Sequence, residues 1–260
     1  MSKRMSTNTV EFGFVAALGR EVSGLTSSSG PFKLASGLCG KTNAEIPDLP
    51  QRIYYTQGAA LICAGTGVTR AYAASKVLIE KFAPRVLISI GFAGSCVPDL
   101  RPGGIVVPAS VLEAGTGKTF RCAFGCGQLV TLDRVAGMAL KQEALNRFAA
   151  LAVDMEATGV AAAAVEAGRE FAAIKVISDG ANQDMAFLAD FVKPEGFKTA
   201  RFLAHIALRP ELSPSVAVLR ANGKMASEAL SKAVNECLGD WRGFAAKHSG
   251  IERIYERGLQ

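Results

Sequence analysis

Short apolar runs alternate with longer segments of helical periodicity along most of this chain. The runs that fit buried strands are "VEFGFVAAL" (10–18), "AALICA" (59–64), "RVLISI" (85–90) and "FAAIKVIS" (171–178). Between them, residues 68–83 and 157–168 place apolar side chains at the spacing of a helix face. This alternation is typical of βαβ units, and it predicts an α/β fold around a largely parallel sheet.

Shorter elements complete the pattern. "GGIVVPA" (103–109) and "GQLVTLDRV" (127–135) read as further strands, and residues 137–148 as a polar helix. Ser213 and Pro214 suit the start of a C-terminal helix, with Ser as the cap and Pro at the first position. We expect a disordered leader over 1–9, one domain over 10–240 and a tail over 241–260.

The order of these elements predicts where a ligand would bind. Parallel strands end at a common edge of the sheet, and ligands of open α/β sheets bind at that edge. Five features follow directly after predicted strands: Glu21, the Gly65 loop, the Gly91–Ser95 loop, Glu156 and Asp179. We therefore expect five loops to converge on one crevice.

Composition narrows the class of protein. Hydrophobic residues make up 49% and charged residues 20%, without a run of roughly 18 apolar residues or an apolar signal segment. The six cysteines are scattered, which predicts reduced thiols in the cytoplasm. The net charge of +6 is dispersed. That dispersion does not favour nucleic acid, and it leaves an anionic ligand or membrane surface open.

Several common chemistries lack a required residue. "AGTGKTF" has Leu112 where a phosphate-binding P-loop needs its first glycine, and "GTGVTR" has Arg70 at the third glycine of a dinucleotide fingerprint. "GFAGS" has Ala93 where a nucleophile elbow has serine. Cys122 and Cys126 have no second pair or nearby histidine to complete a zinc site, so we expect no metal and no cofactor.

The remaining candidates are carboxylates. Asp154 and Glu156 precede an alanine-rich helical run, and Asp179 ends an apolar strand. Taken singly, each fits a helix cap or a turn, and Asp154 is assigned to that structural role. Glu156 and Asp179 together suit a reaction through a sugar cation, in which one acid protonates the leaving group.

The motifs also resemble a known family. "GFVAALGREV", "AGTG", "SIGFAGSCVPDLRPGGIVVP", "AVDMEATGVA" and "FAAIKVISD" are similar, in order and spacing, to the purine nucleoside phosphorylase and methylthioadenosine/S-adenosylhomocysteine nucleosidase superfamily. The resemblance covers about Val10 to Asp179. It implies a three-layer α/β/α fold with a central mixed, mostly parallel sheet, and a homodimer or larger homo-oligomer.

The resemblance also implies roles for individual residues. Asp179 would protonate the purine at N7, Glu21 would activate water, and Glu156 would bind the ribose hydroxyls above Met155. Val135 and Ala136 fall at the positions where members of the family bind the base. The family often has an aromatic residue at the position of Val135. The remaining substrate-binding positions implied are Gly67, Phe92, Ala93, Gly94 and Ser178.

The nucleophile and the substrate are less sharply defined. Arg20 and Arg70 do not reproduce the arginines that clamp phosphate in the phosphorylases, so hydrolysis is favoured over phosphorolysis. The segments around 127–137 and 191–219 look similar to hopanoid-associated members that release adenine from adenosylhopane, with Phe187 or Phe191 on the 5′ side. Methylthioadenosine and S-adenosylhomocysteine are the other candidates. A phosphorylase and a non-catalytic nucleoside-binding protein remain as alternatives.

Overall fold

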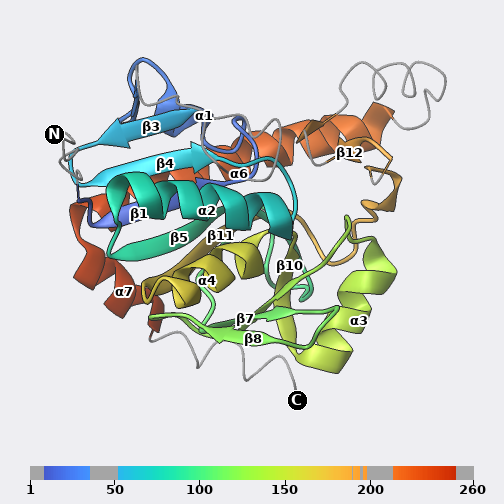
Figure 1. The fold of residues 1–260 in the computed structure, drawn as a ribbon. Helices are drawn as coiled ribbons and strands as arrows, with labels where there is room; N and C mark the ends of the chain where they lie inside the picture. Colours follow the sequence, from blue (N-terminus) through green and yellow to red (C-terminus); the bar gives the residue numbers. More distant parts are fainter. Residues whose placement is uncertain (1–8, 36–51, 189, 194–195, 198–212, 250–260) are drawn as a thin grey trace, which may run out of the picture.

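A mixed sheet of eleven strands lies between two layers of helices in the described part of the chain (Figure 1). The computed structural model describes residues 9–35, 52–188, 190–193, 196–197 and 213–249. Residues 1–8 of the expected leader, Cys39, His205 and the last residues of the expected tail lie outside these ranges. The three-layer α/β/α architecture is confirmed.

The centre of the sheet consists of four parallel strands in the order β4-β1-β5-β11. They are β1 (Phe12–Ala16), β4 (Ala59–Cys63), β5 (Val86–Ser95) and β11 (Glu170–Asp179). Seven shorter strands extend the sheet: β2 (Lys33–Leu34), β3 (Ile53–Thr56), β6 (Ile105–Val106), β7 (Ser110–Glu113), β8 (Thr119–Arg121), β9 (Gln128–Thr131) and β10 (Ala150–Asp154). A separate hairpin joins β12 (Val192–Lys193) to β13 (Gly196–Phe197).

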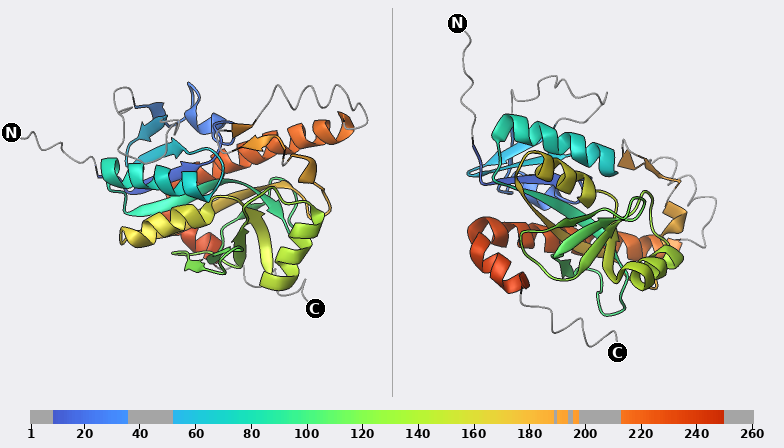
Figure 2. Two further views of the ribbon diagram at one scale, coloured as in Figure 1. Left: turned by 45° about the vertical axis from the view of Figure 1, so that its right-hand side comes forward. Right: turned by 60° about the horizontal axis from the view of Figure 1, so that its bottom comes forward.

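Helices cover both faces of the sheet, as the two further views show (Figure 2). One face carries α2 (Val68–Phe82) and α4 (Ala157–Glu166), and the other carries α6 (Ser213–Gly239) and α7 (Trp241–Ser249). Alternate strand residues feed the two cores, since Leu87 packs with α2 while Ile88 packs with α6. The remaining helices are α1 (Ser23–Thr26), η1 (Ala186–Leu188) and α3 (Met138–Phe148), which packs against β10.

Strand β5 pairs with three neighbours and organises the sheet. Its first half pairs with β1 up to Ser89, its whole length to Gly94 pairs with β11, and its last two residues pair with β10. The segment 91–95 was expected to be a loop, but it continues this strand. Gly91 adopts φ +144°, which a residue with a side chain rarely adopts, and it stays paired with Lys175 of β11.

The chain also stays ordered beyond residue 240. Residues 241–249 were expected in a tail, but they form helix α7 because its apolar face is buried. Trp241 packs its ring 5.0 Å from that of Phe12 and 4.7 Å from that of Phe124, between ring centroids. Phe244 is buried in the same cluster. Across the described ranges, no helix is both long and apolar enough to cross a membrane.

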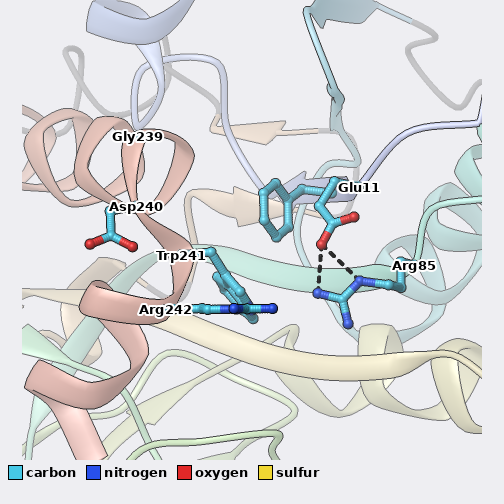
Figure 3. A pocket seen from close by; sticks show the side chains of 7 residues that line it. Glu11, Arg85, Gly239, Asp240, Trp241 and Arg242 are labelled. Atoms are coloured by element: carbon cyan, nitrogen blue, oxygen red, sulfur yellow. Dashed lines mark hydrogen bonds and ion pairs between the residues drawn. The ribbon is translucent and has the colours of Figure 1, made fainter.

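A surface hollow of about 620 Å³ lies beside Trp241, where strands β1 and β5 begin (Figure 3). Its lining includes Asp240, Arg242 and the exposed ion pair between Glu11 and Arg85. The expected ligand site is at the opposite ends of these strands, so this hollow is separate from it.

Helices α2 and α4 touch through their backbones at Gly159. A Cβ atom added there would lie 2.2 Å from the carbonyl oxygen of Val68 and 3.1 Å from the amide nitrogen of Tyr72. This close approach requires a glycine, and it explains the small residues of "ATGVAAAA". It also fixes the start of α2, next to Gly67, against the start of α4.

We expect Gly159→Ala to destabilise the protein by about 1–3 kcal/mol, because the added methyl group forces the two helix backbones apart. Thermal unfolding followed by circular dichroism measures this. Gly223→Ala is the matched control, because Gly223 lies in α6 with open space where its Cβ would be. That control should gain up to about 1 kcal/mol through helix propensity. Equal melting temperatures for the two variants would contradict the packing argument.

Candidate active site

Three sequence-predicted acids, Glu21, Glu156 and Asp179, are buried around the second half of β5. Their residues are 5%, 9% and 8% exposed, respectively. Gly91 and Gly94 of β5 provide the room, since a Cβ on Gly91 would lie 3.0 Å from Glu21 Oε2 and one on Gly94 2.9 Å from Asp179 Oδ2. Strand β5 therefore has Glu21 beside one glycine and Asp179 beside the other.

Glu21 follows β1 in a tight turn. Its Oε2 accepts a hydrogen bond of 3.0 Å from the Leu18 amide, and the Phe92 amide also donates to its carboxylate. Burial raises the pKa of Glu21, and these amides together with Lys175 and Arg20 only partly offset that effect. A raised pKa makes the ionised carboxylate of Glu21 a stronger base, which suits the role of a general base.

Glu156 faces the glycine loop and does not cap its own helix. Its Oε1 accepts 2.9 Å from the Gly67 amide and its Oε2 accepts 3.3 Å from the Met155 amide. Burial raises the pKa of Glu156 to about 8, with further contributions from the negative charges of Asp154 and Glu21. The carboxyl group therefore holds its proton at neutral pH.

Asp154 has the structural role that the sequence assigned to it. Its Oδ2 accepts 2.9 Å from the Ala157 amide in the first turn of α4, and its Oδ1 accepts 2.7 Å from the hydroxyl of Thr131. The two acids of "VDMEA" are thus divided, with Asp154 holding the helix start and Glu156 directed at the Gly67 loop.

Asp179 is the last residue of β11, next to a β-bulge. The register against β5 shifts between Ile177 and Asp179, so Ser178 is the extra residue of the bulge. The Ser178 hydroxyl lies 2.7 Å from Asp179 Oδ1 and 3.4 Å from the carbonyl oxygen of Ala93. The bulge thereby aligns Asp179 with Gly94 rather than with the residue that a regular ladder would give.

Two buried lysines complete the site, and the sequence analysis did not identify either. Lys175 Nζ lies 2.9 Å from Asp154 Oδ2 and 2.9 Å from the hydroxyl of Ser89. Burial lowers the pKa of Lys175, but the carboxylates of Asp154, Glu156 and Glu21 outweigh it and leave the pKa raised. A lysine inside the apolar run "FAAIKVIS" was the available signal, because a charge in a central strand needs a partner.

The second lysine, Lys141 of α3, reaches Asp179. Its Nζ lies 2.5 Å from Asp179 Oδ2, and its side chain is 1% exposed. It also donates to the carbonyl oxygens of Gly180 at 2.8 Å and Gln183 at 2.9 Å. No sequence signal pointed to this residue, because "MALKQEALNRF" reads as a polar helix whose lysine faces water.

Three other predicted residues, Val135, Ala136 and Phe92, belong to three different apolar clusters. Val135 packs with Met185, Phe187, Leu188, Phe191 and Leu219 in one apolar cluster, here termed the 185–191 cluster. Ala136 is buried beside α3 and β10, and Phe92 is partly buried on the α6 side of the sheet. A second hollow, of about 410 Å³, extends from Val68 along residues 113–116 and 131–134 to α3. Neither hollow is lined by Glu21, Glu156 or Asp179.

The described residues contain no group of three or more His, Cys, Asp and Glu side chains arranged to hold a metal ion. Cys122 and Cys126 are both buried. Burial raises the pKa of Cys122 to about 12, which makes its thiol unreactive at neutral pH.

A family model agrees with this arrangement. The model of the phosphorylase superfamily matches residues 12–129 and 118–207, which cover most of the sheet and all three acids. The chain belongs to the phosphorylase superfamily. The superfamily indicated by the motifs is therefore confirmed.

Solved structures of this superfamily share the fold. The chain is similar to 5′-methylthioadenosine nucleosidase from Arabidopsis thaliana, with a TM-score of 0.65, 16% identity and coverage of 89% of this chain and 95% of that one. For futalosine hydrolase of Helicobacter pylori the TM-score is 0.59 and the identity 15%, and the match covers 88% of this chain and 98% of that one. For S-adenosylhomocysteine nucleosidase from Streptococcus pyogenes, in complex with 5-methylthiotubericidin, the TM-score is 0.57 and the identity 19%. That match covers 87% of this chain and 97% of the other.

The raised pKa of Glu156 predicts a pH-dependent effect on stability. The ordinary pKa of 4.5 rises to about 8 on folding, so the folded state keeps a proton that the unfolded chain releases. Between these two values the free energy of unfolding falls as the pH rises. Glu156→Gln removes this effect because its amide is neutral at every pH.

We therefore expect the difference in melting temperature, Glu156→Gln minus the unsubstituted protein, to become more positive as the pH rises from 5 to 8.5. A gain of a few °C corresponds to about 1 kcal/mol in a domain of this size. Calorimetry across the pH range measures the difference. Glu166→Gln is a control because Glu166 is exposed at the surface. If the curve for Glu156→Gln runs parallel to that of the unsubstituted protein, the assigned protonation is wrong.

Proposed function

We propose that the protein is a nucleosidase that hydrolyses the N-glycosidic bond of a 5′-substituted adenosine and releases adenine. The observation that carries this proposal is the set of three buried carboxyl groups with different partners: Glu21 beside Gly91, Asp179 beside Gly94, and Glu156 bonded to the Gly67 amide. Such separated environments allow one acid to donate a proton while another accepts one. Membership of the phosphorylase superfamily supports a nucleoside as the substrate.

Each acid has one task in this reaction. Asp179, in its acid form, donates its proton to N7 of the purine, and the C1′–N9 bond breaks with its electron pair moving to the base. Glu156 binds the ribose hydroxyls, beside Met155. A water molecule forms the new bond to C1′ as Glu21 takes its proton. Val135 and Ala136 hold the base, and Gly67, Phe92, Ala93, Gly94 and Ser178 line the sugar and base.

Water is favoured over phosphate by the position of the arginines. Arg20 next to Glu21 is exposed, and Arg70 is buried within α2, three residues beyond Gly67. A phosphate ion is best held by several convergent charged donors, and these two arginines do not form the clamp of the phosphorylases. Glu21, by contrast, is a buried base suited to activating water.

The 185–191 cluster supports an apolar 5′ substituent. Phe187 and Phe191 pack with Val135, the residue assigned to the base, so an apolar surface adjoins the base position. Adenosylhopane, with its lipid 5′ group, fits this surface and the net charge of +6 that favours contact with an anionic membrane. Methylthioadenosine and S-adenosylhomocysteine are the smaller substrates of the same class. We further propose a cytoplasmic homo-oligomer.

Asp179→Asn is expected to reduce base release by at least about 100-fold, because the amide cannot donate the proton that the departing purine needs. Nucleoside binding, measured by calorimetric titration, should persist. Asp133→Asn is the matched control, since Asp133 is an exposed aspartate in an ion pair with Arg134. Full activity in Asp179→Asn would disprove the acid role.

The nucleophile and the substrate can be tested in one assay. The protein is incubated with methylthioadenosine, S-adenosylhomocysteine, inosine and a lipophilic 5′-substituted adenosine, each with and without phosphate, and free base is measured. We expect adenine and free ribose without phosphate, and the highest rate for an adenosine with an apolar 5′ group. Ribose 1-phosphate formed only with phosphate would identify a phosphorylase. Tight binding of adenine without turnover would identify a binding protein.

A further inference from the structure

Lys141 is one of the largest fully buried side chains in the described structure, and its burial needs an explanation. An ammonium group loses its hydration on burial, and an apolar side chain of similar size avoids this cost. Lys141 lies in the first turns of α3, where its backbone amide bonds the carbonyl oxygen of Gly137. A lysine on the exposed face of the same helix would keep its ammonium group hydrated and would need no protein partner.

All three N–H groups of the Lys141 ammonium have protein acceptors. They are Asp179 Oδ2 at 2.5 Å, Gly180 O at 2.8 Å and Gln183 O at 2.9 Å. The ammonium therefore has one orientation, and it holds the carboxylate of Asp179 in one orientation as well. Gly94 leaves room for this contact, since a Cβ there would lie 2.9 Å from both Asp179 Oδ2 and Lys141 Cε.

The same lysine connects the acid to the segment assigned to the base. Val135 and Ala136 come directly before Gly137, whose added Cβ would lie 2.5 Å from Asp184 Oδ1. Helix α3 starts there, so Lys141 is one helical turn from the base-binding residues. The loop 180–184 thus contacts the start of α3 at Lys141 and at Gly137. Helix α3 therefore fixes the distance between the residues assigned to the base and Asp179.

The two buried lysines have separate partners. Lys175 forms its ion pair with Asp154, whereas Lys141 forms its ion pair with Asp179. In the proposed reaction Asp179 is negatively charged once its proton has left for the base, and Lys141 provides a fixed positive charge at that position.

We propose that Lys141 is a positioning residue for the general acid. It orients the Asp179 carboxyl group toward the base and stabilises the carboxylate that forms as the purine leaves. It acts through Asp179 and has no contact with the substrate. This inference rests on the proposed nucleosidase function, and it assigns to α3 a part in the protonation of the leaving group.

The test compares two leaving groups. Adenine needs a proton to depart, whereas the phenolate of 4-nitrophenyl β-D-ribofuranoside departs without one. Lys141→Met retains the length of the side chain and removes the charge. We expect kcat for adenine release from methylthioadenosine to fall by at least about 100-fold with KM changed by less than about threefold, and kcat for the nitrophenyl riboside to fall by less than about fivefold.

Three further variants make the result decisive. Asp179→Asn should show the same dependence on the leaving group, and adding Lys141→Met to it should cause little additional loss, because both act on one step. Lys141→Arg, which keeps the charge, should recover part of the adenine activity. Lys76→Met is the matched control, since Lys76 forms an exposed ion pair with Glu166 and should retain full activity.

Equal losses of Lys141→Met on both substrates, or additive losses in the double variant, would overturn the inference and leave Lys141 with a purely structural role. Melting temperatures detect a general loss of folding, and the ratio of the two kcat values is independent of the folded fraction. The proposed function fails separately. If the unsubstituted protein releases no base, or if Asp179→Asn is equally impaired on both substrates, the acid role itself is wrong.

Discussion

Charge balance beneath the end of β5 constrains the rest of this structure. Four carboxyl groups, those of Glu21, Asp154, Glu156 and Asp179, are buried there with the ammonium groups of Lys141 and Lys175. Full ionisation of all six would leave two uncompensated negative charges away from water, which is strongly unfavourable. The raised pKa values of Glu21 and Glu156 reduce this imbalance, because burial favours the neutral form of each carboxyl group.

The backbone allows this arrangement through glycines at the points of closest contact. Gly91 and Gly94 admit carboxylate oxygens where a side chain would clash, and Gly159 brings the starts of α2 and α4 together. The last of these contacts places the Gly67 amide at Glu156. The packing of α2 against α4 on one face of the sheet therefore positions the amide that donates a hydrogen bond to Glu156. Any loss of close packing between the helices changes the environment of a site carboxylate.

Periodicity and motif spacing predicted most of the fold and the acids of the site. Strands β1, β4 and β11 and helices α2, α3 and α4 lie where the apolar pattern placed them, because the strands are largely apolar runs buried on both faces and each helix has a helical periodicity. The assignment of Asp154 as a helix cap was confirmed by its bond to the Ala157 amide. The continuation of β5 through Gly91 was missed because a glycine after an apolar run normally ends a strand. Helix α7 was missed because its few apolar residues are separated by charged ones.

The lysines were harder to predict for a different reason. A charge in the middle of β11 could have suggested a buried partner, but only the fold shows that this partner is Asp154. Lys141 gave no signal at all, since its burial depends on how α3 packs against a loop that follows 39 residues later. The β-bulge at Ser178 is equally invisible in the pattern, because it depends on pairing with a distant strand. Long-range contacts of this kind determine which side chains reach the acids.

The shared pairing of β5 also sets a rule for how this chain can change in length. A residue inserted or deleted between Gly91 and Gly94 would shift the strand against β10 and β11 at once, and each glycine would move away from its carboxylate. Length variation among descendants of this sequence should therefore collect in the connections outside the sheet, while this four-residue interval stays constant. The length of this interval therefore fixes the spacing between Glu21 and Asp179.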